Sequence, residues 1–285
     1  MLRPQRRSRP ISDRRLHTCG HLAIGGSWQC WVTTLKGVEV GRYCTDRLPS
    51  YYLDGEEPLG QCWGRAAGRL GLNDQIDPEA FLAVVAGHDP AIGKDLGRRY
   101  GDGSVRGYDA TFSAPKSVSV LFAVGDDEVR EQVVEAHERA VDAVLGWVED
   151  RAHTRLRRHG HVMCVDAEGT VVGLFRQHTS RRTHAVIANR VPAPDGRWLA
   201  LDARSMMVHQ RTLSALYHAC LRSELTRSLG VVWETPEHGI AEINGIPKEL
   251  LAHFSRRTND VERRFEQKLK RFRERMQRDP TVKER

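Results

Sequence analysis

The stretch Val171–Asn189 reads VVGLFRQHTSRRTHAVIAN, and the rest of the chain is best understood around it. Two apolar runs flank a short polar turn, which predicts a β-hairpin with His178 and His184 at its two shoulders. Side chains alternate faces along a strand, and cross-strand neighbours lie roughly 5 Å apart. A turn centred near Arg181 would therefore bring both imidazoles to one metal ion. A surface hairpin with two solvated histidines is the alternative.

Three further stretches accompany the hairpin. They are SYYLDGEEP (50–58), YDATFSAPKSVSV (108–120) and NRVPAPDGRWLALDAR (189–204). Together with the hairpin, they resemble the TrwC/TraI-type (MOBF) conjugative relaxases, over roughly residues 32–272. The resemblance implies the HUH-type relaxase fold, an α/β (α+β) architecture in which a central antiparallel sheet is flanked by helices. It also implies an endonuclease that acts on single-stranded DNA.

The resemblance extends to a metal site. In these relaxases the hairpin carries three histidines, in a segment written approximately HTSRALDPQLHTHAVIAN, whereas the present chain reads HTSRRTHAVIAN. His178 and His184 match the first and third ligands of a divalent metal, Mg²⁺ or Mn²⁺. Arg182 stands where the middle histidine belongs, and about six residues of the loop are missing. We expect the metal to bind weakly, if at all, because two imidazoles bind less tightly than three and a guanidinium repels a cation.

Four residues outside the hairpin complete the catalytic set that the resemblance implies. Tyr43 matches the tyrosine that attacks DNA first, and Tyr51 or Tyr52 matches the one used in the later transfer. A phenol with a pKa of about 10 is a poor nucleophile without assistance, so the tyrosines alone favour packing roles. Asp109 lies inside a predicted strand, where aspartate is disfavoured. The resemblance makes it a base or an orienter of a ligand histidine, and a half-exposed edge position is the alternative.

The charge of the chain is concentrated at its ends. The net charge of +7 includes +5 from residues 1–16 and +6 from residues 256–285, so the middle sums to −4. Basic ends favour contact with a phosphate backbone, and solvated tails are the alternative. Within the resemblance, Lys116, Arg181 and Arg182 are the candidate DNA-binding residues. The partner that it implies is single-stranded DNA at a transfer origin, with a separate helicase or coupling protein as a further candidate.

Three segments are expected along the 285 residues. Residues 1–30 are predicted to be a disordered basic leader, consistent with a misassigned start, residues 31–255 the relaxase domain, and residues 256–285 a basic C-terminal helix or tail. No GxxxxGK[ST] motif occurs, so we expect the helicase domain of such relaxases to be absent. The six cysteines show no CxxC pair, and no apolar run reaches the ~18 residues that span a bilayer. These patterns predict a cytoplasmic protein with no membrane association.

Hydrophobic periodicity predicts the main elements of secondary structure. Strands are expected over residues 31–35 and 106–112, and the segment HGHVMCVDAEG is expected to be a structural strand and turn before the hairpin. Helices are expected over residues 64–72, 78–86, 127–152 (capped by Asp126) and 203–229.

Two functions remain open at the level of sequence. The first is an active relaxase that nicks and transfers DNA through a 5′-phosphotyrosine intermediate, with His178 and His184 plus water or His161 holding the metal. The second is a degenerate, catalytically inactive relaxase remnant that acts at most as a single-stranded DNA-binding protein. Arg182 motivates the second, because its guanidinium places a permanent positive charge where the metal belongs.

Overall fold

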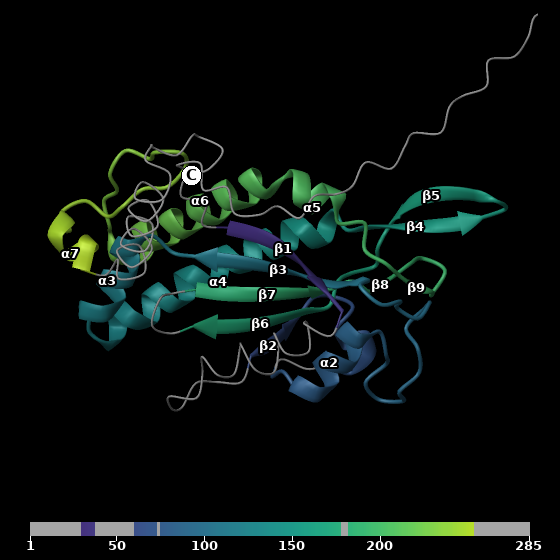
Figure 1. Cartoon of the computed structure of the whole chain (residues 1–285). Helices are drawn as coiled ribbons and strands as arrows, with labels where there is room; N and C mark the ends of the chain where they lie inside the picture. The colour runs from purple at the N-terminus through teal and green to yellow at the C-terminus, as the bar shows by residue number, and fades with distance from the viewer. Residues whose placement is uncertain (1–29, 38–59, 73–74, 178–181, 254–285) are drawn as a thin grey trace, which may run out of the picture.

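The centre of the molecule is a five-stranded antiparallel sheet with the strand order β1-β3-β7-β6-β2 (Figure 1). The computed structural model describes residues 30–37, 60–72, 75–177 and 182–253. The expected central antiparallel sheet is confirmed. Its strands are β1 (Cys30–Lys36), β2 (Gln61–Trp63), β3 (Val105–Ser113), β6 (Val172–Gln177) and β7 (Arg182–Ala188).

Helices cover both faces of this sheet. α4 and α6 pack together on one face with α3 beside α4, and α2 lies on the other face (Figure 1). The helices are α2 (Pro78–Ala86), α3 (Lys116–Val124), α4 (Asp127–Asp150), α5 (Arg204–Val208), α6 (Gln210–Leu229) and α7 (Lys248–His253). Two hydrophobic cores result, one on each side of the sheet. Within the described ranges, no helix is both long and apolar enough to cross a membrane.

Strand β7 shows how one strand serves both cores. Ala185 and Ile187 lie in the core beneath α4 and α6, whereas Val186 and Ala188 lie in the core beside α2. Because side chains alternate faces and both faces are covered here, these four consecutive positions are all apolar. The first three residues of β7, Arg182 to His184, are polar instead, and their side chains alternate between the same two faces.

The helices α2 and α4 begin and end close to the predicted positions. The side chains of Asp77 and Asp126 accept hydrogen bonds from the backbone N–H groups of Glu79 and Val129, and these bonds satisfy donors that have no partner inside the helix. Gly87 follows α2 in the left-handed conformation that commonly ends a helix. Both predicted helices are therefore confirmed.

Two predicted helices differ from the structure. Residues 64–72 form only a short 3-10 turn, η3 (Gly68–Leu70), because Gly64 and Gly71 adopt positive φ angles of 104° and 67° that interrupt an α-helix. The segment 203–229 is divided between α5 and α6. The division falls at His209, which has a turn-like φ of −94° and ψ of 18°.

A two-stranded ribbon projects from the body at the end opposite α3 and α7 (Figure 1). It consists of β4 (His153–Arg158) and β5 (His161–Asp166), joined by His159 and Gly160. Both joining residues have positive φ angles, 49° and 80°, as a tight type I′ turn requires. The strand β5 was predicted, but its pairing into a separate ribbon was not. A second small hairpin is formed by β8 (Val191–Pro192) and β9 (Trp198–Leu199).

Candidate functional site

The hairpin that organises the sequence is the pair β6 and β7. Its last pair is Gln177 with Arg182, so four residues connect the strands. His184 pairs with Phe175, whereas a turn centred near Arg181 would pair it with residue 178, so the expected turn centre was wrong. The register of β7 is set by its ladder with β3 on the other side, and a slip of one residue would turn every apolar side chain of β7 to the wrong face.

Polar side chains from β3 and β7 form a stripe on one face of the sheet. Thr111 pairs with His184 and Ser113 pairs with Arg182, while Asp109 lies two residues before Thr111 on the same face. This face is opposite to α4 and α6, because the neighbouring residues of both strands lie in the core beneath those helices. We call these five residues the polar stripe: Asp109, Thr111, Ser113, Arg182 and His184.

Asp109 and His184 are in direct contact within the polar stripe. Nδ1 of His184 lies 3.0 Å and 3.3 Å from the two carboxylate oxygens of Asp109. The hydroxyl of Thr111 lies 3.3 Å from the same nitrogen and 3.4 Å from Oδ2 of Asp109. Asp109 is only 4% exposed and lies on an interior strand, so the half-exposed edge position is excluded. Because a carboxylate only accepts hydrogen bonds, Asp109 holds a proton on Nδ1 of His184 and fixes the orientation of the imidazole ring.

Arg182 and Lys116 lie near the end of the polar stripe. Nε of Arg182 donates a hydrogen bond of 3.0 Å to the hydroxyl of Ser113, and the arginine is half-buried. Lys116 is exposed and is the first residue of α3, which begins shortly after β3 ends. Positive side chains therefore follow the carboxylate and imidazole toward the end of the sheet that bears the β6–β7 connection.

A buried hydrogen-bond network contacts β7 on the face of the sheet that α4 and α6 cover. His137 of α4 lies 2.8 Å from the hydroxyl of Thr183 through Nε2 and 2.7 Å from the hydroxyl of Tyr217 through Nδ1. Thr183 lies between Arg182 and His184, on the opposite face of the strand. Sequence reasoning missed this network, as it missed Thr111 and Ser113. The spacing of two and four residues after Asp109 was a usable signal for the latter pair, whereas the contacts of His137 depend on tertiary packing.

Comparisons with known proteins identify the family of the chain. The TrwC relaxase family model matches residues 37–285. The chain belongs to the TrwC relaxase family. It is 35% identical over 232 residues to the multifunctional conjugation protein TraI of Escherichia coli (strain K12), a match that covers 74% of this chain but only 13% of TraI.

Solved structures of TrwC match this relaxase chain along most of their length. The metal-bound complex of the conjugative relaxase TrwC with oriT DNA matches with a TM-score of 0.73 and 32% identity, covering 84% of this chain and 83% of that one. The metal-free complex matches with a TM-score of 0.72 and the same identity and coverage. A copper-bound complex matches with a TM-score of 0.71 and 30% identity, covering 90% of this chain and 87% of that one. The HUH-type relaxase fold expected from the sequence is therefore confirmed.

Several predicted relaxase residues lie outside the described part of the chain. They are Tyr43, Tyr51, Tyr52, His178 and Arg181. His161, which was considered as a substitute metal ligand, lies next to the tip of the ribbon. Figure 1 places that tip at the opposite end of the molecule from the end of β6 and the start of β7. His161 is therefore too remote to complete a site with His184.

The described residues do not supply the three-ligand metal site of the relaxase family. No group of three His, Cys, Asp or Glu side chains among them is close enough to hold a metal ion. In the polar stripe, Asp109 already contacts Nδ1 of His184, and Arg182 presents a cation. A guanidinium repels a divalent ion, and the described residues supply only His184 of the two expected histidine ligands.

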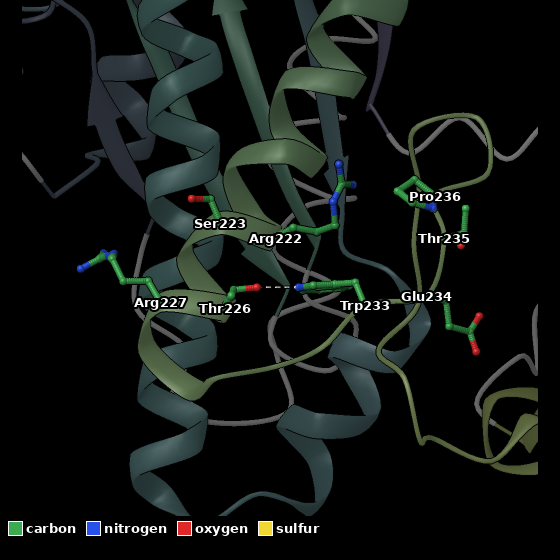
Figure 2. Close-up of a pocket in the computed structure, with 8 residues that line it drawn as sticks. All are labelled: Arg222, Ser223, Thr226, Arg227, Trp233, Glu234, Thr235 and Pro236. Carbon is green, nitrogen blue, oxygen red and sulfur yellow. Dashed lines mark hydrogen bonds between the residues drawn. The ribbon is translucent and has the colours of Figure 1, made fainter.

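A pocket of about 660 Å³ lies apart from the polar stripe, along the C-terminal half of α6 (Figure 2). The indole N–H of Trp233 donates a hydrogen bond of 3.0 Å to the hydroxyl of Thr226 and fixes the ring (Figure 2). Arg222 donates to the backbone oxygen of Gly239 at 2.8 Å, and Glu234 also lines the pocket. Because α6 covers the other face of the sheet, this pocket lies away from the polar stripe.

Proposed function

We propose that this chain is a conjugative relaxase domain that nicks single-stranded DNA at a transfer origin and becomes joined to it through a 5′-phosphotyrosine. Tyr43 makes the first attack, and Tyr51 or Tyr52 serves the later transfer. The contact between Asp109 and His184 carries the proposal, because it fixes the orientation of an imidazole on the polar face of the sheet. Membership of the relaxase family and the likeness to TrwC structures solved with oriT DNA support it.

The reaction exchanges one phosphodiester bond for another. The phenol oxygen of Tyr43 attacks the phosphorus, the bond from phosphorus to the 3′ oxygen breaks, and a tyrosyl 5′-phosphodiester forms. The phenol loses a proton and the released 3′ hydroxyl gains one, so neither a redox partner nor a nucleotide is consumed. The bond is conserved in the adduct, which allows religation after transfer.

The chain's own residues have defined tasks in this proposal. Asp109 is a positioning residue, because it fixes the proton and the ring plane of His184. His184 is the imidazole that would contact the phosphate or an ion bound there. The relatives include metal-bound TrwC, and His178 with His184 would be the ligands here, but no step is assigned to a metal because the described residues supply only one of these two histidines.

The ribbon β4–β5 offers a second contact with DNA. A two-stranded β-ribbon fits the major groove of a duplex. Arg157 and Arg158 are exposed near its tip, while Arg155 pairs with Asp202 at 3.0 Å and anchors the ribbon to the body. One TrwC structure holds a 27-mer that comprises a recognition hairpin and the cleavage site. We propose that the ribbon of this chain binds such a duplex stem beside the single strand.

Two further contacts belong to the proposal. The basic residues 256–285 add contacts with DNA phosphates. A separate helicase or coupling protein would then unwind or transport the DNA.

A second candidate function is DNA binding without cleavage. Arg182 favours it, because a guanidinium in the polar stripe opposes a bound cation. The two candidates differ in one observable, the covalent adduct.

The test is nicking of a labelled library of single-stranded oligonucleotides, with and without Mn²⁺, followed by separation of adducts on a denaturing gel. We expect an adduct that is lost in Tyr43→Phe, which removes the nucleophilic oxygen with little change in volume. Tyr51→Phe and Tyr52→Phe are the matched controls and should still form the first adduct. An adduct that persists in Tyr43→Phe and maps to Tyr51 or Tyr52 would refute the assignment, and binding without any adduct would favour the second candidate.

A further inference from the structure

The pocket beside the C-terminal half of α6 has a second wall, formed by residues 231–244 (Figure 2). This segment folds back on itself, and the backbone N–H of Glu234 donates to the backbone oxygen of Glu242 at 2.9 Å. The N–H of Ile243 donates to the buried hydroxyl of Ser117 on α3 at 2.8 Å. The second wall is therefore attached to the body of the protein, and the pocket is formed before any ligand arrives.

Trp233 presents a fixed aromatic ring to this pocket. Its indole N–H donates to the hydroxyl of Thr226 at 3.0 Å, and that hydroxyl donates in turn to the backbone oxygen of Val231 at 3.1 Å. The ring is half-buried, and within the described part of the chain neither a second ring nor a cation stacks on it. A ring held in this way loses little freedom when a flat ligand stacks on it.

Arg222 places a positive charge in the same pocket. Its guanidinium donates to the backbone oxygen of Gly239 at 2.8 Å, a neutral partner, and no carboxylate among the described residues forms an ion pair with it. Burial lowers the pKa of Arg222, because its charged form loses solvation. The carboxylate of Glu234 points away from this guanidinium (Figure 2). Arg227, which also lines the pocket, is paired with Glu224 instead.

A fixed ring and a guanidinium without a carboxylate partner match the two parts of a nucleotide. A base stacks on an aromatic side chain, and a phosphate accepts hydrogen bonds from an arginine. The volume of about 660 Å³ lies within the range of roughly 300–1,000 Å³ that is typical of pockets for small ligands. An acidic peptide would satisfy Arg222 but would leave the indole without a flat partner, and an apolar ligand would leave the guanidinium without an anion.

We propose that this pocket binds one nucleotide unit, with the base stacked on Trp233 and the phosphate held by Arg222. A segment of single-stranded DNA and a free nucleotide both contain this unit, and the experiment below separates them. The inference goes beyond the proposed nicking, because the pocket lies away from the polar stripe and its occupation needs no covalent step.

The experiment is photo-crosslinking with iododeoxyuridine, a base analogue that becomes joined to an aromatic side chain stacked on it. The two probes are its free monophosphate and a single-stranded oligonucleotide that carries the analogue at each position in turn. The full chain is used as Tyr43→Phe and in EDTA, so that binding is measured apart from cleavage. Mass spectrometry identifies the cross-linked side chain, and thermal unfolding confirms that each variant folds.

The cross-link is expected at Trp233. Trp233→Leu should abolish it and weaken binding of the same probe about 5- to 100-fold, as the loss of a stacked base predicts. Trp233→Phe should retain the cross-link with a smaller loss of affinity, because it keeps a ring. Trp147→Leu is the matched control, since Trp147 is also half-buried and has the cation of Arg151 4.4 Å from its ring, and it should change neither result.

The phosphate contact is tested by removing the charge of the ligand. A methylphosphonate beside the cross-linked base, or the uncharged nucleoside in place of the monophosphate, should weaken binding to the unaltered pocket about 10-fold. In Arg222→Gln the same change of ligand should have little effect, because the partner of the phosphate is already absent. Arg227→Gln is the matched arginine control and should retain the full loss.

A cross-link at Trp233 from the oligonucleotide alone would identify single-stranded DNA as the ligand, and one from the monophosphate alone would identify a free nucleotide. Failure of both probes to cross-link Trp233 would overturn the inference, as would equal losses on charge removal in the unaltered pocket and in Arg222→Gln. Nicking is scored separately, with Tyr43 intact. A covalent adduct without a cross-link at Trp233 would leave nicking in place and exclude the pocket, and the opposite result would refute nicking alone.

Discussion

Replacing Arg182 with histidine should raise the affinity of the chain for Mn²⁺. Two unit charges 4 Å apart interact by about 4 kcal/mol at an effective dielectric constant of 20, so a guanidinium repels a divalent ion by about 8 kcal/mol at that distance. Arg182 is half-buried, and solvent and salt screen much of this repulsion. A remaining gain of about 1.4 to 3 kcal/mol, which includes one new imidazole ligand, corresponds to a Kd lowered about 10- to 100-fold.

Calorimetric titration with Mn²⁺ measures this gain directly. Arg176→His is the matched control, because Arg176 is also half-buried and lies on β6, but its side chain pairs with Glu138 of α4 at 3.0 Å, on the other side of the sheet. It loses the same charge and gains the same imidazole, yet it should leave Mn²⁺ binding unchanged. A third protein that combines Arg182→His with a β6–β7 connection lengthened by about six residues should bind most tightly, because the reach of His178 is then restored as well.

The reasoning would be refuted by tight Mn²⁺ binding in the unaltered chain that is abolished by His178→Ala or His184→Ala. That result would show that the short connection already forms a working metal site. Nicking provides an independent readout, since Arg182→His should make cleavage dependent on Mn²⁺ and sensitive to EDTA.

Three further predictions concern stability and DNA affinity. The buried side chain of Glu149 accepts three hydrogen bonds, so Glu149→Ala should lower the free energy of unfolding by about 3 kcal/mol in urea titrations, and a loss below about 1 kcal/mol would contradict its role. Burial and the charge of Arg222 lower the pKa of His218 to about 4 in the folded chain, whereas the same histidine has a pKa of about 6.5 in the unfolded chain. Between pH 4 and pH 6.5 the unfolded chain therefore binds more protons than the folded one. Stability should therefore fall by up to about 3 kcal/mol from pH 7 to pH 4, and His218→Leu should flatten this dependence; an unchanged slope in the variant would exclude His218 as its cause. Deletion of residues 256–285 should reduce the salt dependence of DNA binding in filter-binding assays, and an unchanged slope would show that the tail makes no phosphate contact.

The sequence predicted the elements of the fold better than their register. Alternation placed Asp109 on a strand and apolar periodicity placed α2 and α4, because these patterns are local. The partner of Asp109 was suggested only by the resemblance, since the 3.0 Å contact with His184 depends on how β3 pairs with β7. The turn of the β6–β7 hairpin was misplaced for the same reason: its register is set by a strand that lies far away in the sequence.

Other features could not be read from local patterns. The predicted helix over residues 64–72 failed because an apolar period says little about Gly64 and Gly71, whose positive φ angles interrupt it. The contact of His137 with Thr183 joins a helix to a strand 46 residues later, and no local pattern in either segment predicts it. The hydrogen bond from Arg182 to Ser113 was not predicted either, because it depends on the pairing of β7 with β3.

The ladder between β3 and β7 also bears on how such a chain changes over generations. Every residue of β7, from Arg182 to Ala188, pairs with β3, so the position of His184 beside Asp109 is fixed without help from the connection to β6. Insertions or deletions in that connection therefore leave the pairing of Asp109 and His184 unchanged. They decide whether the second expected ligand, His178, can reach the same ion. Under the proposed function, a change of length in this one connection would therefore alter the requirement for a divalent ion while the pairing of β3 with β7 is kept.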